Sequence, residues 1–200
     1  MRAVSDYRAD VLTILGDATG RRYSESILDV GLRKALSTYG DFFPRKELVR
    51  ASVTEVENDG AVVPWMFGAD TDVLFVKYHG AYCPFSSYRE PGKLILNMPE
   101  MPAAGEMLEI TVRTPHTIKG LDEKTQTTVP DAHCMILSTG AAGHAMHIRA
   151  RSVTEVFGKR PEDREALTSQ AEALLSEFWR ELSGIQAAPV DPLPRGNFEI

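Results

Sequence analysis

The spacing of apolar residues predicts one helix over residues 5–15 and a second over about 25–39. Residue types that begin or end helices flank both segments, namely Ser5, Gly16, Ser24 and Gly40. Because the connection between the two segments is short, we expect the two helices to pack against each other as a hairpin.

From residue 46 onward, apolar and polar residues alternate, which indicates half-buried strands. The clearest strand spans residues 107–114, where Leu108, Ile110 and Val112 share one face. Shorter strands are predicted at 49–54, 73–78 and 93–96, with long surface loops at 82–92 and 98–105.

The sequence Asn58-Asp59-Gly60 predicts a tight hairpin turn. Its return strand, residues 61–67, contains Pro64, which favours an edge strand or a short strand. We therefore expect a small antiparallel sheet of roughly four or five strands.

Two further helices are predicted after a polar segment at residues 115–129. The first runs from 130 to about 157, and its stripe of small residues should let another backbone approach closely. The second runs from 161 to about 182, with Gly184 as its end. The residues expected to make the close helix contact are Gly140, Ala141 and Gly143.

The tail, residues 185–200, is rich in proline and has no periodicity, so we expect an extended arm that orders on a partner. Its candidate partner-binding residues are Ile185, Pro189, Val190, Pro192, Leu193, Phe198 and Ile200.

These elements predict the α+β class, with an N-terminal helical hairpin and two long C-terminal helices around a small antiparallel β insert. The chain would end in the extended arm. The expected boundaries are 1–45 for the hairpin, 46–129 for the β-rich insert with long loops, 130–184 for the C-terminal helical pair and 185–200 for the arm. The hairpin and the helical pair would form one domain.

Composition narrows the class of protein without assigning an activity. The 200 residues include 22 Lys and Arg against 28 Asp and Glu, and the net charge of −6 argues against a free-standing nucleic-acid binder. No apolar run is long enough to span a membrane, and the first residues do not resemble a signal peptide. The two cysteines, Cys83 and Cys134, are too few for a disulfide scaffold, so we expect a cytoplasmic origin.

Candidate chemistry is sparse. His144 and His147 lie three residues apart, and with His133 they suggest one alternative, a small metal-dependent enzyme. Neither cysteine has a recognisable catalytic partner, and no phosphate-binding loop is present. We therefore expect a protein that is not an enzyme and has no catalytic residue, metal or cofactor.

Basic residues gather in two places and suggest contact with an acidic partner or with DNA, although surface charge at helix ends is the ordinary interpretation. They are Arg21 and Arg22 in the first connection, and Arg149, Arg151, Lys159 and Arg160 after the small-residue helix.

The stretches Asp10–Asp17, Leu32–Tyr39 and Thr114–Asp122, together with Tyr23-Ser24, resemble head–tail connector (adaptor) proteins of tailed phages and prophages. A Thr-rich loop and a small-residue helix at 137–145 follow the third stretch, as in that family. The order of two helices, a β insert, two helices and a C-terminal arm is also similar.

The resemblance implies a structural virion protein of the phage neck, assembled in the host cytoplasm. It implies a ring of about twelve copies that binds the portal protein, joins it to tail or stopper proteins and lines the DNA channel. DNA would pass without sequence-specific contacts, and no membrane is involved. A tail-completion or tail-terminator protein, usually about six copies in a ring, is the alternative within the virion.

Overall fold

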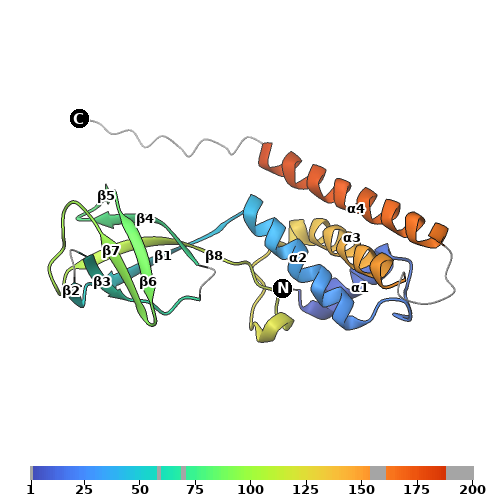
Figure 1. The fold of residues 1–200 in the computed structure, drawn as a ribbon, viewed down its shortest axis with the longest axis horizontal. Helices are drawn as coiled ribbons and strands as arrows, with labels where there is room; N and C mark the ends of the chain where they lie inside the picture. The colour runs from blue at the N-terminus through green and yellow to red at the C-terminus, as the bar shows by residue number, and fades with distance from the viewer. Residues whose placement is uncertain (1, 58–59, 69–70, 154–160, 188–200) are drawn as a thin grey trace. The chain divides into compact units, whose positions relative to one another are not determined.

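The computed structural model describes residues 2–57, 60–68, 71–153 and 161–187 (Figure 1). The chain divides into two compact units, a helical unit of Met1–Phe43 with His116–Ile200 and a β unit of Pro44–Pro115. The helices of the described residues are α1 (Val4–Ile14), α2 (Glu25–Phe42), α3 (Cys134–Val153) and α4 (Pro161–Ala187), with short 3-10 turns at Leu121–Glu123 and Asp131–His133. The expectation of a mixed α and β chain with antiparallel sheets is confirmed.

Helix α3 is the centre of the helical unit and packs against α1, α2 and α4 (Figure 1). A helix that is surrounded by others can be apolar or small on every side, which explains why α3 has no polar face. Helices α1 and α2 make few contacts with each other, and both pack mainly against α3. The two helices therefore do not form the expected hairpin by direct packing but are held together by a third helix. The buried residues of α3 are Cys134, Leu137, Ser138, Gly140, Ala141, Ala142, Gly143, Ala145, Met146 and Ala150.

Several predicted helix ends were wrong. Helix α1 begins at Val4 rather than Ser5, because the Asp6 carboxylate accepts a hydrogen bond from the Ala3 N–H at 2.8 Å and fixes the first turn there. Helices α2 and α4 continue through Gly40 and Gly184, which were expected to end them. Neither glycine has a positive φ, whereas Gly16, which does follow the end of α1, has φ +61°.

The segment from His116 to Val129 was expected in the β insert but belongs to the helical unit. Its Lys119 carbonyl accepts a hydrogen bond from the Val4 N–H at 2.8 Å, and its Thr127 hydroxyl accepts one from the Lys119 N–H at 2.9 Å. The Thr127 hydroxyl in turn donates to the Arg2 carbonyl at 2.5 Å, so this bond and the Val4 bond hold the N-terminus against the segment. Its apolar residues Ile118, Leu121 and Val129 are buried in the helical core.

The β unit consists of two four-stranded antiparallel sheets that share one apolar core. One sheet has the order β1-β8-β4-β5 and the other β2-β3-β7-β6. Side chains from both sheets meet in the core, so each sheet has one inner and one outer face. The strands are β1 (Arg45–Ser52), β2 (Glu55–Glu57), β3 (Gly60–Pro64), β4 (Asp72–Tyr78), β5 (Ala81–Cys83), β6 (Ser86–Glu90), β7 (Lys93–Asn97) and β8 (Met107–Thr114).

Leu108, Ile110 and Val112 face the core as predicted, but the strand count was too low. The segment expected as a loop at 82–92 contains β6 and most of β5, both of which pair with neighbouring strands. Of the two alternatives for the return strand, the short one is confirmed, since β3 ends at Pro64. It is not an edge strand, because it pairs with both β2 and β7.

None of the helices in the described part of the chain is both long and apolar enough to cross a bilayer.

Candidate interaction surfaces

The small residues of α3 lie where neighbouring helices come closest. A Cβ atom placed on Gly140 would be 2.8 Å from ring atoms of Phe178 in α4. A Cβ atom on Gly143 would be 2.8 Å from Leu175 Cγ, also in α4. Ala141 is fully buried, and its carbonyl faces α2 rather than α4. The stripe of small residues therefore makes two close helix contacts, one with α4 and one with α2, which the sequence alone did not distinguish.

Replacing Gly140 by leucine should destabilise the helical unit by about 1–3 kcal/mol through overpacking against Phe178. The matched control is Gly184→Leu in α4, where nothing lies within 4 Å of the added Cβ. Urea unfolding followed by circular dichroism measures both variants. An unchanged midpoint for Gly140→Leu would contradict the close contact.

The predicted C-terminal arm falls mostly outside the described residues. Ile185 lies within α4 and is partly buried, so the arm does not begin there. The other predicted partner-binding residues, Pro189, Val190, Pro192, Leu193, Phe198 and Ile200, lie outside the described part of the chain.

The three histidines of the metal alternative do not form one site. His133 lies just before α3, and the helical rise places it roughly 16 Å from His144. Burial, Lys34 and His147 lower the pKa of His144. Within the described ranges, no group of three or more His, Cys, Asp or Glu side chains is placed to hold a metal ion.

His133 instead takes part in an aromatic cluster at the end of α2. Its Nδ1 atom lies 2.6 Å from the Tyr39 hydroxyl oxygen. Burial raises the pKa of Tyr39 to about 12, so the phenol is protonated. The His116 ring stacks edge-on against Tyr39, and its Nε2 lies 2.7 Å from the Phe43 carbonyl. This bond joins the two points where the chain leaves and re-enters the helical unit.

The cysteines have structural surroundings. Cys134 is buried, and its Sγ lies 3.1 Å from the Tyr7 hydroxyl and 3.6 Å from the Pro130 carbonyl. Burial, followed by the bond to Cys134, raises the pKa of Tyr7. Cys83 is partly buried on β5. Neither thiol is positioned beside a histidine base by any described contact.

The connection between α1 and α2 is organised by Asp17, a role the sequence analysis missed. Its carboxylate accepts hydrogen bonds from the backbone N–H groups of Arg21, Arg22 and Tyr23, at 3.2, 2.7 and 3.1 Å. Burial acts to raise the pKa of Asp17, but the three N–H donors outweigh it, so the pKa is lowered. An aspartate eight residues before a predicted helix would have been the only sequence signal.

The Asp17→Asn variant should melt at a lower temperature than the unmodified protein at pH 7, by on the order of 5 °C. A carboxylate with a lowered pKa stabilises the fold above its unfolded pKa of about 3.9, and this stabilisation is lost as the pH falls through the folded pKa. The difference in melting temperature should therefore shrink between pH 5 and about pH 2. The exposed Asp41→Asn is the control, and a difference that persists at the lowest pH would contradict the role of Asp17.

The first basic group and part of the second meet at one end of the helical unit. The Arg149 guanidinium lies 4.8 Å from the ring centroid of Tyr23, which follows Arg21 and Arg22 directly. Lys159 and Arg160 of the predicted basic group lie outside the described residues. The structure therefore places an exposed basic end on the helical unit, built from two loop arginines and the last turns of α3.

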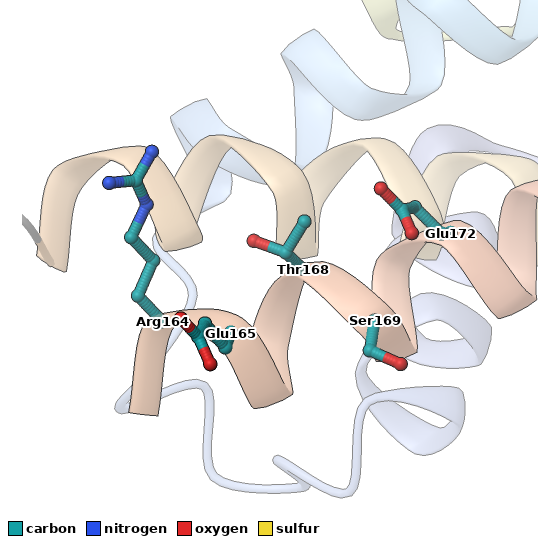
Figure 2. Close-up of a pocket in the computed structure, with 5 residues that line it drawn as sticks. All are labelled: Arg164, Glu165, Thr168, Ser169 and Glu172. Carbon is teal, nitrogen blue, oxygen red and sulfur yellow. The ribbon is translucent and has the colours of Figure 1, made fainter. Parts of the chain in front are cut away.

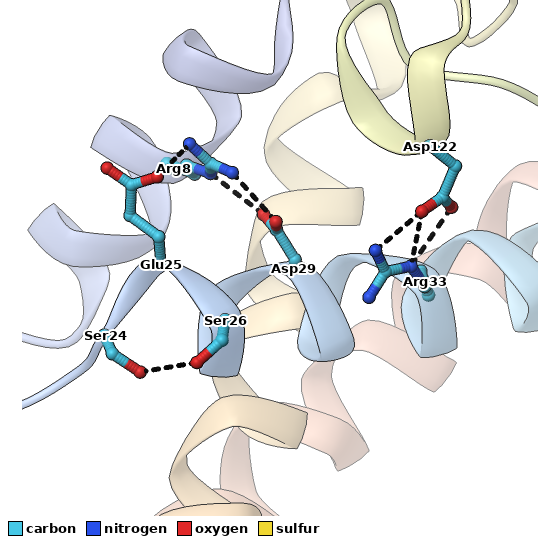
Figure 3. A network of polar contacts seen from close by, with 7 residues as sticks. All are labelled: Arg8, Ser24, Glu25, Ser26, Asp29, Arg33 and Asp122. Carbon is cyan, nitrogen blue, oxygen red and sulfur yellow. Dashed lines mark hydrogen bonds and ion pairs between the residues drawn. The ribbon is translucent and has the colours of Figure 1, made fainter.

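A network of ion pairs joins α1, α2 and the turn at Leu121–Glu123 (Figure 3). Arg8 of α1 donates to both carboxylate oxygens of Asp29, at 2.9 and 2.8 Å, and to Glu25 at 2.7 Å. Arg33 of α2 makes a forked contact with Asp122, with its shortest bond 2.6 Å. Arg33 and Asp122 are about half exposed, so their pairing contributes little to stability and mainly fixes geometry.

A shallow hollow of about 370 Å³ lies along α4. Its described lining comes from a single helix, as Figure 2 shows, and consists of Arg164, Glu165, Thr168, Ser169 and Glu172. Ligand sites usually converge side chains from several elements around an apolar floor. Among its described residues, this hollow brings together side chains from one helix only.

The outer face of the β1-β8-β4-β5 sheet is the most unusual surface of the β unit. Leu48 is 60% exposed and Tyr82 is 67% exposed, with Phe75 and Met107 also exposed. Basic side chains lie between them on the same face, as the register of the strands shows. We call this the basic sheet face, and it comprises Lys46, Leu48, Arg50, Ser52, Asp72, Phe75, Lys77, Tyr82, Met107, Glu109, Thr111 and Arg113.

Exposed apolar groups that share a face mark an interaction surface more often than isolated ones do.

No family model and no curated protein sequence matched this chain when it was compared with them.

Proposed function

We propose that this chain is a structural virion protein, a head–tail connector that forms a ring under the portal, joins it to the tail and lines the DNA channel. The observation that carries the proposal is that the three stretches resembling connector proteins pack against one another in the helical unit. Arg33 of the second stretch pairs with Asp122 of the third, and Tyr39 of the second contacts His116 of the third.

The first stretch lies in the same assembly of contacts. Val11 of α1 is fully buried in the helical core, and Asp17 at the end of the stretch accepts the N–H of Tyr23, the next residue pair that resembles the family. The sequence stretches that resemble the family therefore form one connected structural unit. This is expected when the stretches come from a shared fold and not from chance matches in surface loops.

The surfaces of both units suit a subunit of an assembly. A ring subunit needs two different lateral faces that fit head to tail. The basic sheet face offers exposed apolar and charged groups on the β unit. On the helical unit, Trp179 of α4 is 47% exposed and its ring lies edge-on against Phe42 of α2.

A DNA channel requires contacts that do not hold DNA tightly. With the net charge of −6, the chain repels phosphate overall, and the basic end at Arg21, Arg22 and Arg149 is the place where it would meet the DNA backbone. Contacts to phosphate carry no sequence information, which agrees with passage of DNA of any sequence.

The test is assembly with the portal protein encoded in the same genome. The two proteins are co-expressed, and the complex is weighed by native mass spectrometry and imaged by electron microscopy. We expect a ring of about twelve copies bound to the portal. A ring of about six copies bound to a tail tube would support a tail-completion or tail-terminator protein instead. Absence of any portal complex would overturn the proposal.

Deleting residues 186–200 should leave the helical and β units folded but weaken binding to the portal or the tail. The deletion removes most of the predicted arm and only the last two residues of α4, Gln186 and Ala187. Circular dichroism checks the fold, and the amount of portal complex recovered measures binding. Full recovery with the shortened chain would rule out the arm as a partner-binding element.

A further inference from the structure

The β unit has two outer faces of opposite charge. The basic sheet face holds four basic side chains, Lys46, Arg50, Lys77 and Arg113, and two acidic ones, Asp72 and Glu109, a net of +2. The other sheet has an outer face that we call the acidic sheet face. Its accessible residues are Glu55, Glu57, Tyr88, Glu90 and Lys93, whereas Val62 and Ile95 on the same side are buried. Three of these are acidic and one is basic, a net of −2.

The two faces point away from each other. One side of each sheet faces the shared core, with Ile110 and Val76 from the first sheet and Leu94 and Leu96 from the second. Because successive residues of a strand alternate between faces, the charged residues lie on the opposite side of each sheet. One copy therefore presents a positive surface and a negative surface in opposite directions.

The basic sheet face is ordered by its own contacts. The Lys77 ammonium lies 4.5 Å from the ring centroid of Tyr82, and the Phe75 ring meets Tyr82 edge-on at 5.8 Å. A bulge between Val73 and Phe75 turns Phe75 outward. Arg50 pairs across the strands with Glu109 at 3.0 Å. The face is thus a firm surface of mixed apolar and positive character.

The acidic sheet face is ordered in the same way. Lys93 donates to Glu55 at 2.8 Å and lies 3.6 Å from Glu57, which leaves the acidic charge in excess on β2. Glu90 adds a further exposed carboxylate on β6. Tyr88, on the same face, is partly exposed and supplies apolar surface.

We propose that the basic sheet face of one copy docks on the acidic sheet face of the next copy. The inference rests on the proposed ring and names the surface that builds it. The net charges of the two faces are opposite in sign and equal in size. Exposed apolar groups lie on both faces, several on the basic sheet face and Tyr88 on the acidic sheet face. Because the two faces differ and point in opposite directions, each copy binds two neighbours, which generates a ring when the rotation closes.

A second copy fits the basic sheet face better than nucleic acid does. Asp72 and Glu109 lie among the basic residues, where they would repel phosphates. A nucleic-acid groove usually presents a run of cations without acidic neighbours. On a second copy, by contrast, the net charges of the two sheet faces attract each other. Asp72 and Glu109 on the basic sheet face, and Lys93 on the acidic sheet face, also meet residues of opposite sign.

The test reverses charge on one face at a time. The first variant, Lys46→Glu with Lys77→Glu, makes both faces negative. The second, Glu57→Lys with Glu90→Lys, makes both positive. We measure self-association of the whole chain by sedimentation velocity at low salt, over protein concentrations up to about 1 mM. Each variant should weaken association at least about tenfold, and raised salt should weaken that of the unmodified protein.

Two rescues distinguish docking between unlike faces from a general effect of charge. A 1:1 mixture of the two variants should associate again, because negative copies alternate with positive ones. A single chain with all four substitutions should also associate, because its two faces have exchanged signs. The matched control, Glu165→Lys with Glu172→Lys on α4, alters two exposed charges on the helical unit and should leave association unchanged.

Several results overturn the inference. They are an unmodified protein that stays monomeric throughout, single-face variants that associate normally, and rescues that fail although circular dichroism shows folded chains. Should Lys77→Glu not fold, Lys46→Glu with Ser52→Glu reverses the same face on β1 alone. Loss of binding to a single-stranded oligonucleotide, with association unchanged, would assign the face to nucleic acid and also overturn the inference.

The docking surface and the connector function can fail independently, and the two tests distinguish these failures. A portal-bound ring that assembles normally with one face reversed refutes the docking surface alone. The full rescue pattern without any portal complex refutes the connector alone.

Discussion

The Phe178→Ala variant should lose about 3–5 kcal/mol of unfolding free energy, the largest loss we expect from a single truncation in the helical unit. Phe178 is 0% exposed and lies on the backbone of α3 at Gly140. Alanine would leave a cavity that the glycine opposite cannot fill, because it has no side chain to move inward. Urea unfolding followed by circular dichroism at the helix signal measures the loss.

The neighbouring residue supplies the control. Trp179 is 47% exposed and contacts Phe42 edge-on, so Trp179→Ala removes a larger side chain from a less buried position. We expect it to cost about 1 kcal/mol, well below the loss at Phe178. Equal losses in the two variants would show that Phe178 does not anchor α4 on α3.

The helices were largely predictable because their apolar stripes are long. The sequence could not reveal that α3 is central, because a helix buried on several sides has no polar face for a periodic pattern to detect. It also could not assign the small residues of α3 to partners. Gly140 faces α4, whereas Ala141 faces α2, and only the packing of three helices separates these contacts.

Three glycines were predicted to end helices. The prediction is confirmed for Gly16 and wrong for Gly40 and Gly184, and backbone conformation explains the difference. A glycine ends a helix when its backbone adopts a positive φ, as Gly16 does at +61°. Gly40 and Gly184 keep a helical backbone, at a cost of about 1 kcal/mol each relative to alanine. The residue type is the same in all three places, so the sequence cannot distinguish them.

The strands show how far alternation can be interpreted. Strand β8 alternates cleanly and was predicted at its observed bounds. Strand β6 is exposed throughout and has no apolar side to alternate with, so its pairing with β7 left no pattern in the sequence. The bulge in β4 between Val73 and Phe75 turns Phe75 to the other face of the sheet from the one that strict alternation predicts. For that reason the exposed aromatic pair of Phe75 and Tyr82 could not be predicted from the sequence.

The candidate surfaces depend on pairings between distant segments. Lys77 and Glu109 share a face only because β4 lies beside β8 in this register. A shift of one residue would turn either side chain to the core. The opposite charges of the two sheet faces are therefore a property of the fold that no local count of charges reveals.

Gly31 of α2 was not singled out by its sequence, yet among the described glycines of the helical unit it lies nearest to a neighbouring backbone. A Cβ atom on Gly31 would be 2.6 Å from the Ala141 carbonyl oxygen and 3.3 Å from the Ala145 nitrogen. At Gly140 the obstacle is a ring that can rotate, but here it is the backbone of α3. Replacing Gly31 by leucine should cost about 3 kcal/mol or somewhat more, because the two helices must move apart.

Glycine 40 of the same helix provides the matched control for this prediction. A Cβ atom on Gly40 meets only the His116 ring, at 4.0 Å. Gly40→Ala should therefore stabilise α2 by up to about 1 kcal/mol through helix propensity, whereas Gly31→Ala should destabilise it despite the same gain. The opposite signs of these two alanine variants in urea unfolding isolate the contact from the propensity. Two stabilising alanines would mean that α2 and α3 are not in backbone contact at Gly31, and that α3 is less tightly enclosed than its burial indicates.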